Sequence, residues 1–533
     1  MTTSGSTEAL RGAPYFRAAA RLTWSSWLEM FQPSTVPANL AAGLTIALVA
    51  LPLNLALALA CGLPPAVGLV TGAIAGVVGA LLGGSRLQVT GPEVALAPMT
   101  LLIVTAEGPS GLMMATFLCG LFQIAFGVLR LGQVVRRVPR PVIGGFMTAI
   151  GLLVFDTQLP RLLGLPREVG TLHEALSLDT LSQVQPATLA IGLLVMATIL
   201  IAPKLTSRAP APLLGLAVAV LLALVLPGVP RLEPLPGAFP VPRLPNFAEL
   251  NFLHLIPEAL ALAVLASIDS LLCAASVDAR TGSRTLGDQE LCAQGLANMA
   301  SACLGGMPVA AAIVRSVAAI EAGASTRLAP LFQSVCLGLA LLVFGAAVAF
   351  VPVVALAAIL LIVGYRLLDV PLLRRLWALD RWEAGILVAT AAAILRFDFV
   401  SGVALGCALS LARFALAMAR SLAVRRAETG SSLDVLRIEG PLFFANQTLV
   451  DRALEPLQAS RGAVLDLSGV TAVDSSGAVA LRLGLERLAS ESRPIWLTNV
   501  PEHAPWLHEE LRAARSPNLR IATSPDAAAR GGE

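Results

Sequence analysis

The sequence predicts a polytopic α-helical membrane protein that ends in a small α/β domain. Hydrophobic residues make up 56% of the 533 residues and charged residues only 13%, about half the charged share of an ordinary soluble protein. Stretches such as 40–59, 186–202 and 331–355 hold no acidic or basic residue, and each can cross a bilayer as a helix of about 20 residues. The tail after Arg425 carries charged residues at the frequency of a soluble domain.

Apolar segments predict about fourteen membrane helices. Twelve of them are predicted near 38–60, 65–83, 110–132, 141–159, 185–203, 209–227, 253–278, 286–304, 328–350, 351–366, 381–396 and 399–422. Two further stretches, 91–105 and 308–322, follow glycine pairs, carry a proline near their start and are short for a full crossing. Such interrupted segments in matching places of two halves are typical of transporter binding sites. We therefore expect a seven-plus-seven arrangement.

The placement of basic residues predicts the orientation, because cytoplasmic loops carry an excess of Lys and Arg. With the N terminus inside, the inner loops hold Arg86, Arg130, Arg136, Arg137, Arg140, Lys204, Arg208, Arg280, Arg284, Arg327, Arg366, Arg374, Arg375 and Arg381. The outer loops hold only Arg161, Arg167, Arg231, Arg243 and Arg396. Both termini are therefore expected in the cytoplasm, with the protein in the cell (inner) membrane.

Four parts of the chain are predicted. A cytoplasmic N-terminal segment covers 1–35, the transmembrane domain covers 36–426, the α/β domain covers 433–525, and a disordered tail covers 526–533. The tail domain is read as alternating elements: strands at 435–439, 442–444, 463–467, 495–498 and 519–522, and helices at 448–458, 477–489 and 502–514. The first 35 residues show no pattern of a cleaved signal peptide.

Several classes of function are not indicated by the composition. The net charge of +3 is small and its basic residues are spread along the chain, so nucleic acid is not an expected partner. The seven cysteines lie in apolar segments without metal-ligand spacing, and no phosphate-binding Gly-x-x-x-x-Gly-Lys-Ser/Thr loop is present. No enzyme activity and no organic cofactor are expected.

The two short segments predict an anion site. Half-helices that begin near the middle of the bilayer present free N–H groups and positive dipole ends to a ligand. The N–H groups would come from 91–95 and 309–313, and the candidates for substrate contact there are Gly91, Glu93, Val94, Ala311, Ala312 and Ile313. The alternative is that the small residues only allow tight helix packing.

Charged residues inside apolar segments give further candidates. Asp269 lies in the middle of an apolar span, where a carboxylate needs a partner, a cation or a proton; a purely structural carboxylate is the alternative. Arg315 would raise the positive potential for the substrate, or else neutralise Asp269 or Glu93. Asn54 follows Pro52 and would offer its amide to an oxyanion or to a backbone group freed by the proline.

Several motifs together resemble the sulfate permease (SulP) family of anion transporters, whose membrane domain is joined to a cytoplasmic STAS domain. The resemblance covers nearly the whole chain. It is carried by Ala50-Leu51-Pro52-Leu53, Gln88-Val89-Thr90-Gly91-Pro92, 289–298, Gly305-Gly306-Met307-Pro308, Arg315, and 464–470 followed by Asp474-Ser475-Ser476-Gly477. It implies an inverted repeat with core and gate subdomains, a substrate site between helices 1, 3, 8 and 10, and a homodimer.

The sequence around Asp269 is similar to that of the sodium-coupled bicarbonate members, in which this Asp helps to hold sodium. Those members are expected to have threonines where this chain has Cys273, Ile313 and Glu93. Fewer hydroxyl ligands and a second carboxylate in the same pocket make proton coupling a competitor of sodium coupling. Asp269, Cys273 and Glu93 are the candidate coupling residues, with Asp269 as the candidate Na⁺ ligand.

The tail offers one candidate regulatory position. Ser475 matches the serine that anti-sigma-factor antagonists of the STAS fold phosphorylate. Asp-Ser-Ser-Gly is also a good N-cap for the following helix, and this second interpretation is favoured.

The whole sequence predicts a secondary active transporter of small anions in the lipid bilayer. Bicarbonate or a similar inorganic anion is the first expected substrate, coupled to Na⁺ or H⁺. A sulfate or dicarboxylate (fumarate or succinate) carrier of the same fold, or an uncoupled anion exchanger or channel, is the alternative.

Overall fold

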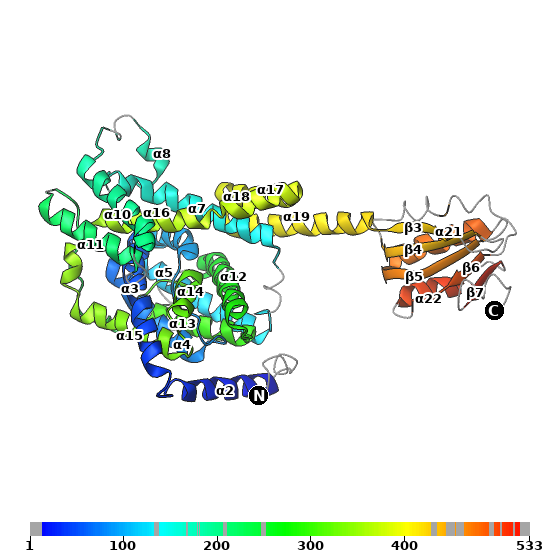
Figure 1. The fold of residues 1–533 in the computed structure, drawn as a ribbon, viewed down its shortest axis with the longest axis horizontal. Coiled ribbons are helices and arrows are strands. Elements are labelled where there is room, and N and C mark those ends of the chain that lie inside the picture. The colour runs from blue at the N-terminus through cyan, green and yellow to red at the C-terminus, as the bar shows by residue number, and fades with distance from the viewer. Residues whose placement is uncertain are drawn as a thin grey trace. The chain divides into compact units, whose positions relative to one another are not determined.

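The computed structural model consists of two compact units, 1–406 and 407–533, and each unit is described by itself (Figure 1). The described residues are 13–132, 138–166, 169–177, 180, 182–205, 210–226, 228–246, 252–427, 434–443, 454, 463–489, 495–501, 504–514 and 518–522. Arg136, Arg137, Arg167, Arg208 and the tail 526–533 lie outside this set, as does almost all of the helix predicted at 448–458.

Helices build the first unit, and the last of them, α19, continues past Gly406 into the second unit. They are α2 (Ala13–Glu29), α3 (Val36–Ala60), α4 (Pro65–Leu82), α5 (Ala97–Val128), α7 (Arg140–Leu162), α8 (Leu172–Ala175), α10 (Pro186–Leu205), α11 (Ala211–Val225), α12 (Ile256–Thr281), α13 (Gly287–Cys303), α14 (Ile313–Glu321), α15 (Leu328–Val343), α16 (Val353–Leu367), α17 (Val370–Leu379), α18 (Arg381–Arg396) and α19 (Phe399–Arg420). Short 3₁₀ turns lie at η1 (Val94–Leu96), η2 (Phe252–Leu255) and η3 (Ala347–Phe350).

All fourteen predicted segments correspond to elements named above. Eight helical stretches of the described chain are long and apolar enough to cross a membrane, and α11 and α15 are shorter apolar helices. The remaining segments are shorter: α13, α18 and α14 span 17, 16 and 9 residues. One of the eight long stretches, from η1 through α5, joins a half-helix to a full span across a kink. At the kink, Gly108 has a φ of 69°, a value that glycine adopts without the steric penalty of a side chain.

The two short segments differ from the prediction at their start. Both were expected to be helical from their first residues, yet each begins with an extended strand, β1 (Thr90–Pro92) and β2 (Val309–Ala311). The strands pair antiparallel, with Gly91 opposite Ala310. Pro92 accounts for the first difference, because a proline disfavours the helical conformation of the residue before it, here Gly91. At 309–311 the pairing with β1 and the bond from the N–H of Val309 to Asn298 hold the chain extended. Helical structure resumes only at η1 and at α14.

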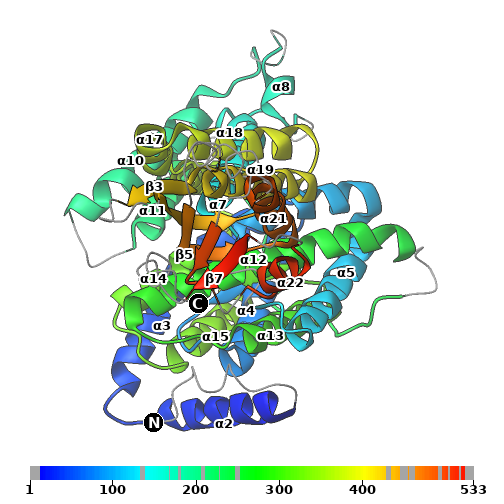
Figure 2. The ribbon, with the colours of Figure 1, turned by 90° about the vertical axis from the view of Figure 1, so that its right-hand side faces the viewer.

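Helix α2 was not predicted, since 1–35 was expected only as a cytoplasmic segment. It lies across the end of the helix bundle in both views (Figures 1 and 2). Trp27 Nε1 donates to the carbonyl of Leu81 at 2.8 Å, which fixes α2 to the end of α4. Trp24 and Leu28 are exposed. An exposed apolar face beside a polar one is typical of helices at the membrane surface.

The second unit contains a five-stranded sheet in the order β3-β4-β5-β6-β7. Its strands are β3 (Ala423–Ala427), β4 (Asp434–Leu442), β5 (Ala463–Val473), β6 (Ile495–Thr498) and β7 (Leu519–Ala522), and its helices are α21 (Ser475–Ala489) and α22 (Pro505–Ala513). Only β3 pairs antiparallel, and the other neighbours are parallel. The sheet therefore takes in β3, which precedes the predicted start of the domain at 433, and β4 merges two predicted strands.

Candidate functional site

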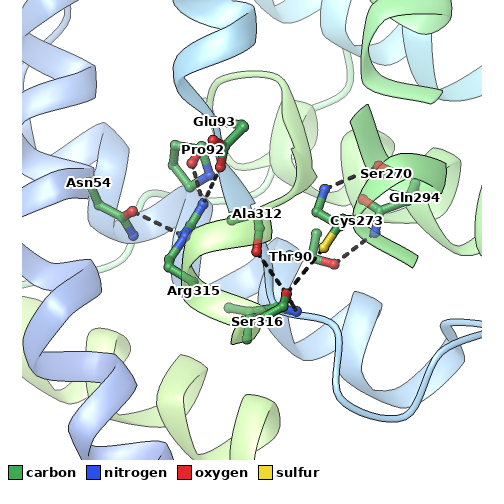
Figure 3. Close-up of polar contacts among 12 residues, drawn as sticks. Asn54, Thr90, Pro92, Glu93, Ser270, Cys273, Gln294, Ala312, Arg315 and Ser316 are labelled. Atoms are coloured by element: carbon green, nitrogen blue, oxygen red, sulfur yellow. Dashed lines mark hydrogen bonds and ion pairs between the residues drawn. The ribbon is translucent and has the colours of Figure 1, made fainter. Parts of the chain in front are cut away.

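The site lies where β1 and β2 pair and the two short helical segments begin. Glu93 is the residue between β1 and η1, and Ala312 is the residue between β2 and α14. Arg315 follows in the first turn of α14, and its side chain points back toward Pro92 and Glu93 (Figure 3). Asn54, from α3, faces the same guanidinium group. Four predicted residues, Asn54, Gly91, Glu93 and Arg315, therefore lie together.

Arg315 is the centre of this group. Its side chain is fully buried. Nη1 donates to Asn54 Oδ1 at 3.3 Å, and Nη2 forms an ion pair with Glu93 Oε2 at 3.2 Å. Nη2 also donates to the carbonyl of Pro92. Gly91 makes room for the guanidinium, because a Cβ at this position would lie 2.6 Å from Nη1. This geometry is compatible with both roles considered for Arg315. Its ion pair with Glu93 neutralises that carboxylate, and its buried positive charge beside the Asn54 amide can attract an anionic substrate.

Two hydrogen-bond donors of this group lack a partner. Asn54 Nδ2 and Arg315 Nε are buried and make no hydrogen bond to the described part of the chain. A buried donor without an acceptor costs about 1–3 kcal/mol. Oxyanions accept hydrogen bonds from several donors at once, so a small anion at this point would satisfy both groups.

Asp269 is buried on α12, with 3% of its surface exposed. Its Oδ2 has no hydrogen-bond partner among the described residues, and no ion pair within 4 Å is found for it there. Glu93 and Arg315 are the charges that act on it electrostatically. A buried carboxylate without a hydrogen-bond or ion-pair partner is expected where the group takes up a proton or a cation.

Hydroxyl groups near Asp269 are already engaged. Ser316 Oγ donates to the carbonyl of Ala312 at 2.7 Å and accepts from Val89 N and from the Cys273 thiol. Ser270 Oγ accepts from the N–H of Ala311 at 3.1 Å. A sodium ion needs several free oxygen ligands, and the thiol of Cys273 and the side chain of Ile313 supply none. Two of the three positions where threonines were expected in the sodium-coupled members, Cys273 and Ile313, thus offer no oxygen ligand.

The backbone N–H groups of β2 correct one expectation. Residues 309–313 were expected to direct free N–H groups at the anion. Instead, the N–H of Val309 donates to Asn298 Oδ1, that of Ala311 to Ser270 and that of Ala312 to the carbonyl of Val89. Strand pairing and polar side chains thus occupy these donors. The first turn of α14, which begins at Ile313, keeps N–H groups without intrahelical partners. The N–H of Val94, at the start of η1, donates to the Glu93 carboxylate.

A polar face of α13 holds the two strands, and it was not predicted as part of the site. Gln294 Nε2 donates to Thr90 Oγ1 and to Glu290 Oε1, each at 2.8 Å. Asn298 Nδ2 donates to Gln123 Oε1 at 2.7 Å and to the carbonyl of Val309 at 3.1 Å. The signal was visible in the sequence, because Glu290, Gln294 and Asn298 recur every four residues within a segment predicted to cross the membrane.

Ser475 is the first residue of α21 and is exposed. Asp474 precedes it, and Asp474 Oδ1 accepts from the N–H of Gly477 at 2.7 Å, which is the geometry of an N-cap. The local structure is therefore accounted for by helix capping, the interpretation favoured from the sequence, and the exposed hydroxyl stays a candidate for phosphorylation.

Comparison with known proteins identifies the family. The model of the sulfate permease family matches residues 37–390, and that of the STAS domain matches residues 426–504. "Putative sulfate transporter YvdB" of Bacillus subtilis is 32% identical, over 79% of this chain and 83% of its own. "Bicarbonate transporter BicA" of Synechocystis is 27% identical, over 82% of this chain and 83% of its own.

Solved structures agree with this assignment. The transmembrane domain of a cyanobacterial bicarbonate transporter BicA is 29% identical, with a TM-score of 0.64, and the match covers 70% of this chain and 98% of that one. Murine Slc26a9, an anion transporter solved in the inward-facing state, has a TM-score of 0.79 at 19% identity over 95% of this chain and 93% of its own, and shows the shared fold. The chain is a multi-pass membrane protein that belongs to the sulfate permease family of anion transporters and carries a C-terminal STAS domain.

Proposed function

We propose that the protein is a secondary active transporter that moves a small oxyanion together with a proton, and that Arg315 and Asn54 bind the anion. The observation that supports this most strongly is the pair of buried, unpartnered donors, Asn54 Nδ2 and Arg315 Nε, on two side chains in mutual contact. An intramembrane arginine beside unpaired donors is an arrangement suited to a negatively charged ligand.

Glu93 provides a link between the anion and a proton. Its carboxylate pairs with Arg315 and so occupies the guanidinium as an oxyanion would. A substrate must compete with Glu93 for the same donors, and protonation of Glu93 removes its charge and releases the guanidinium. The proton then neutralises the carboxylate that the substrate displaces, so that no unpaired charge stays buried. Asp269, whose Oδ2 lacks a partner, is the second proton acceptor of the mechanism.

Bicarbonate is the first candidate substrate. Two relatives support it by name, a BicA that is 27% identical and a BicA membrane domain that is 29% identical. Sulfate is the second candidate, because the relative with 32% identity is named as a sulfate transporter. Both ions are small oxyanions that accept several hydrogen bonds, so the donor pair by itself does not discriminate between them.

An uptake assay in proteoliposomes tests the coupling and the substrate together. Radiolabelled bicarbonate, sulfate and fumarate are offered with and without sodium, and with and without an inward proton gradient. We expect uptake of one of the first two anions to follow the proton gradient, and Asp269→Asn to abolish the gradient-driven part. Strict sodium dependence, or gradient-driven uptake unchanged in Asp269→Asn, would contradict the proposal. A conductance far above carrier turnover would identify a channel.

The proposal places both termini in the cytoplasm. Arg86, Arg284 and Arg327, from three loops that the sequence assigned to the inner side, line one common cavity. Arg161, assigned to the outer side, lines another cavity together with Gly62 and Glu233. This grouping supports a single consistent topology, and the excess of arginine supports its direction. We further propose that two copies of the protein form a homodimer in the cell membrane.

A further inference from the structure

The cavity lined by Arg86, Arg284 and Arg327 is positively charged and lies away from the transport site. It has a volume of about 840 Å³ and is walled by α2, the loop between α4 and β1, the end of α12, the start of α13 and the loop before α15. Among the described residues that line it are Arg86, Arg284 and Arg327, and none of these lining residues is Asp or Glu. None of the transport-site residues Asn54, Glu93, Asp269 and Arg315 lines it.

One wall of the cavity is held rigidly. Arg327 is buried and donates from Nη1 to the carbonyl of Ser85 and from Nη2 to that of Gly83, at 3.0 and 2.7 Å. Glu290, behind the wall, accepts from the N–H groups of Gly84 and Ser85 at 2.8 and 3.2 Å. Arg327 thus binds the carbonyl groups of the loop between α4 and β1, and Glu290 binds its N–H groups. These bonds hold Ser85 in a fixed position.

Several polar groups of the cavity lack partners. Ser85 is 5% exposed, and its Oγ has no hydrogen-bond partner among the described residues. Gln289 Oε1 is likewise buried and unpaired there. Arg284 is exposed, and no ion pair is found for it within the described chain. Arg86 is half exposed and pairs with Glu29 at 2.6 Å. The cavity thus combines a buried hydroxyl donor with guanidinium groups.

We propose that this cavity binds a phosphate-bearing anion, either a small soluble phosphorylated molecule or the headgroup of an anionic phospholipid. Guanidinium groups bind phosphate through paired N–H donors, the Ser85 hydroxyl adds a fixed donor, and the Gln289 oxygen would accept from a hydroxyl of the ligand. The volume falls in the range of sites for small organic ligands and is far larger than a bicarbonate or sulfate ion requires.

Such a ligand would act on the N-terminal helix. Leu22 and Thr23 of α2 line the cavity together with Thr281 at the end of α12, the helix that carries Asp269. Thr23 also accepts from Gln289 Nε2 at 2.6 Å. A molecule bound there contacts α2, α12 and α13 at once and stabilises their association.

The test uses the purified full-length protein and two probes. Pyrophosphate is titrated calorimetrically as the soluble probe, and native mass spectrometry compares bound phosphatidylglycerol with phosphatidylcholine as the lipid probes. We expect saturable binding of pyrophosphate, or selective retention of phosphatidylglycerol, and the arm that succeeds identifies the source of the phosphate. Arg284→Gln and Ser85→Ala should each weaken that binding, Arg284→Gln by at least about tenfold, because each removes a donor to the ligand.

Matched controls separate this site from general charge and from the transport site. Arg280→Gln removes an exposed arginine of α12 that does not line the cavity, and Asn54→Ala alters the transport site. Binding should persist in both. Absence of binding in both arms, equal weakening in Arg280→Gln, or loss of binding in Asn54→Ala with retention in Arg284→Gln would each overturn the proposal. The uptake assay stands apart from these measurements, so the two proposals can fail separately.

Discussion

At the scale of single residues, the chemistry of the site depends on where the guanidinium of Arg315 lies. Gly91 fixes that position by the absence of a side chain, since a Cβ would lie 2.6 Å from Nη1. The obstructing atom is the end of a flexible side chain, so the fold can accommodate a substitution while the guanidinium moves. One added methyl group at position 91 therefore tests whether transport depends on the position of the Arg315 guanidinium.

Gly91→Ala should lower the transport rate by at least tenfold, because the displaced guanidinium leaves Asn54 and Glu93. Loss of these buried contacts should lower the stability by about 1–3 kcal/mol without unfolding the protein. The measurement is substrate uptake in proteoliposomes, with the melting temperature followed in detergent. Gly385→Ala is the control, since a Cβ there meets no atom within 4 Å. Wild-type uptake in Gly91→Ala would show that Arg315 needs no such precise placement.

Candidate residues can be chosen from the sequence, but the groups that they contact cannot. Asp269, Glu93 and Arg315 stand out as charges in apolar segments, and a charge there is functional by default. The sequence does not show which groups form hydrogen bonds with one another in the folded protein. The N–H groups of Ala311 and Ala312 were expected to be free, and they are taken by Ser270 and Val89, which approach only through tertiary packing of α12 and β1.

At the scale of elements, small residues allow the helices around the site to pack closely. A Cβ on Gly120 of α5 would lie 2.5 Å from the carbonyl oxygen of Gly295 on α13, and a Cβ on Gly295 would lie 2.5 Å from that of Gly120. Both obstructing atoms are backbone, so the helices must separate if either glycine is replaced. Since α13 also holds β1 and β2 through Gln294 and Asn298, this contact positions the site.

Gly120→Ala and Gly295→Ala should each lower the stability of the membrane unit by roughly 1–3 kcal/mol, the cost of overpacking. The double variant should cost less than the sum of the two, because a single separation of the helices accommodates both methyl groups. Thermal unfolding in detergent measures all three. Simple additivity would show that the two glycines do not share one contact.

The boundaries of elements were less predictable than their existence. All fourteen apolar segments were found, yet the two short ones begin as strands. Periodicity cannot reveal a three-residue pairing between Thr90–Pro92 and Val309–Ala311, because the partners lie over two hundred positions apart. Strand β3 was missed for a similar reason: it follows α19 directly and is defined only by its pairing with β4.

In the STAS unit, Asp466 ties three strands together. It accepts from Arg437 Nε of β4 at 3.0 Å, from Asn499 Nδ2 after β6 at 2.8 Å and from the N–H of Ser468 at 3.0 Å. Burial by itself raises the pKa of this carboxyl, but the hydrogen bonds from Asn499 and Ser468 and the charge of Arg437 outweigh it and lower the pKa below its usual value. The folded state therefore prefers the ionised carboxylate.

Asp466→Asn should destabilise the STAS unit at neutral pH by about 1–3 kcal/mol, the usual effect of losing charged hydrogen bonds. Because the folded pKa is lowered, this stabilisation is complete above the unfolded pKa of about 3.9 and is lost as the pH falls through the folded value. Hydrogen exchange of β5 and β6 in the full-length protein, corrected for intrinsic rates, should show a difference that shrinks on acidification. Glu439→Gln, in an exposed pair with Arg425, should change little, and equal protection in both variants would contradict this role.

At the scale of the whole molecule, two separate cavities gather loops that are distant in the sequence. One contains Arg284 among the loops assigned to the inner side, and the other contains Glu233 among those assigned to the outer side. Loops that wall one cavity lie on the same side of the bilayer. The orientation predicted from the arginine distribution therefore implies that the two cavities open on opposite sides of the membrane, which can be tested at one residue in each.

Arg284→Cys should react with a membrane-impermeant maleimide only in inside-out vesicles, and Glu233→Cys only in intact cells. Both side chains are exposed, so accessibility depends on the side of the membrane. The parent for both variants is a protein with its seven native cysteines replaced by Ala or Ser, and a permeant maleimide should label both variants in either preparation. The reverse pattern would invert the orientation and place the arginine-rich cavity outside the cell. Labelling of both positions from one side would contradict the span count between them, because a chain that passes from Glu233 through α12 to Arg284 crosses the membrane once.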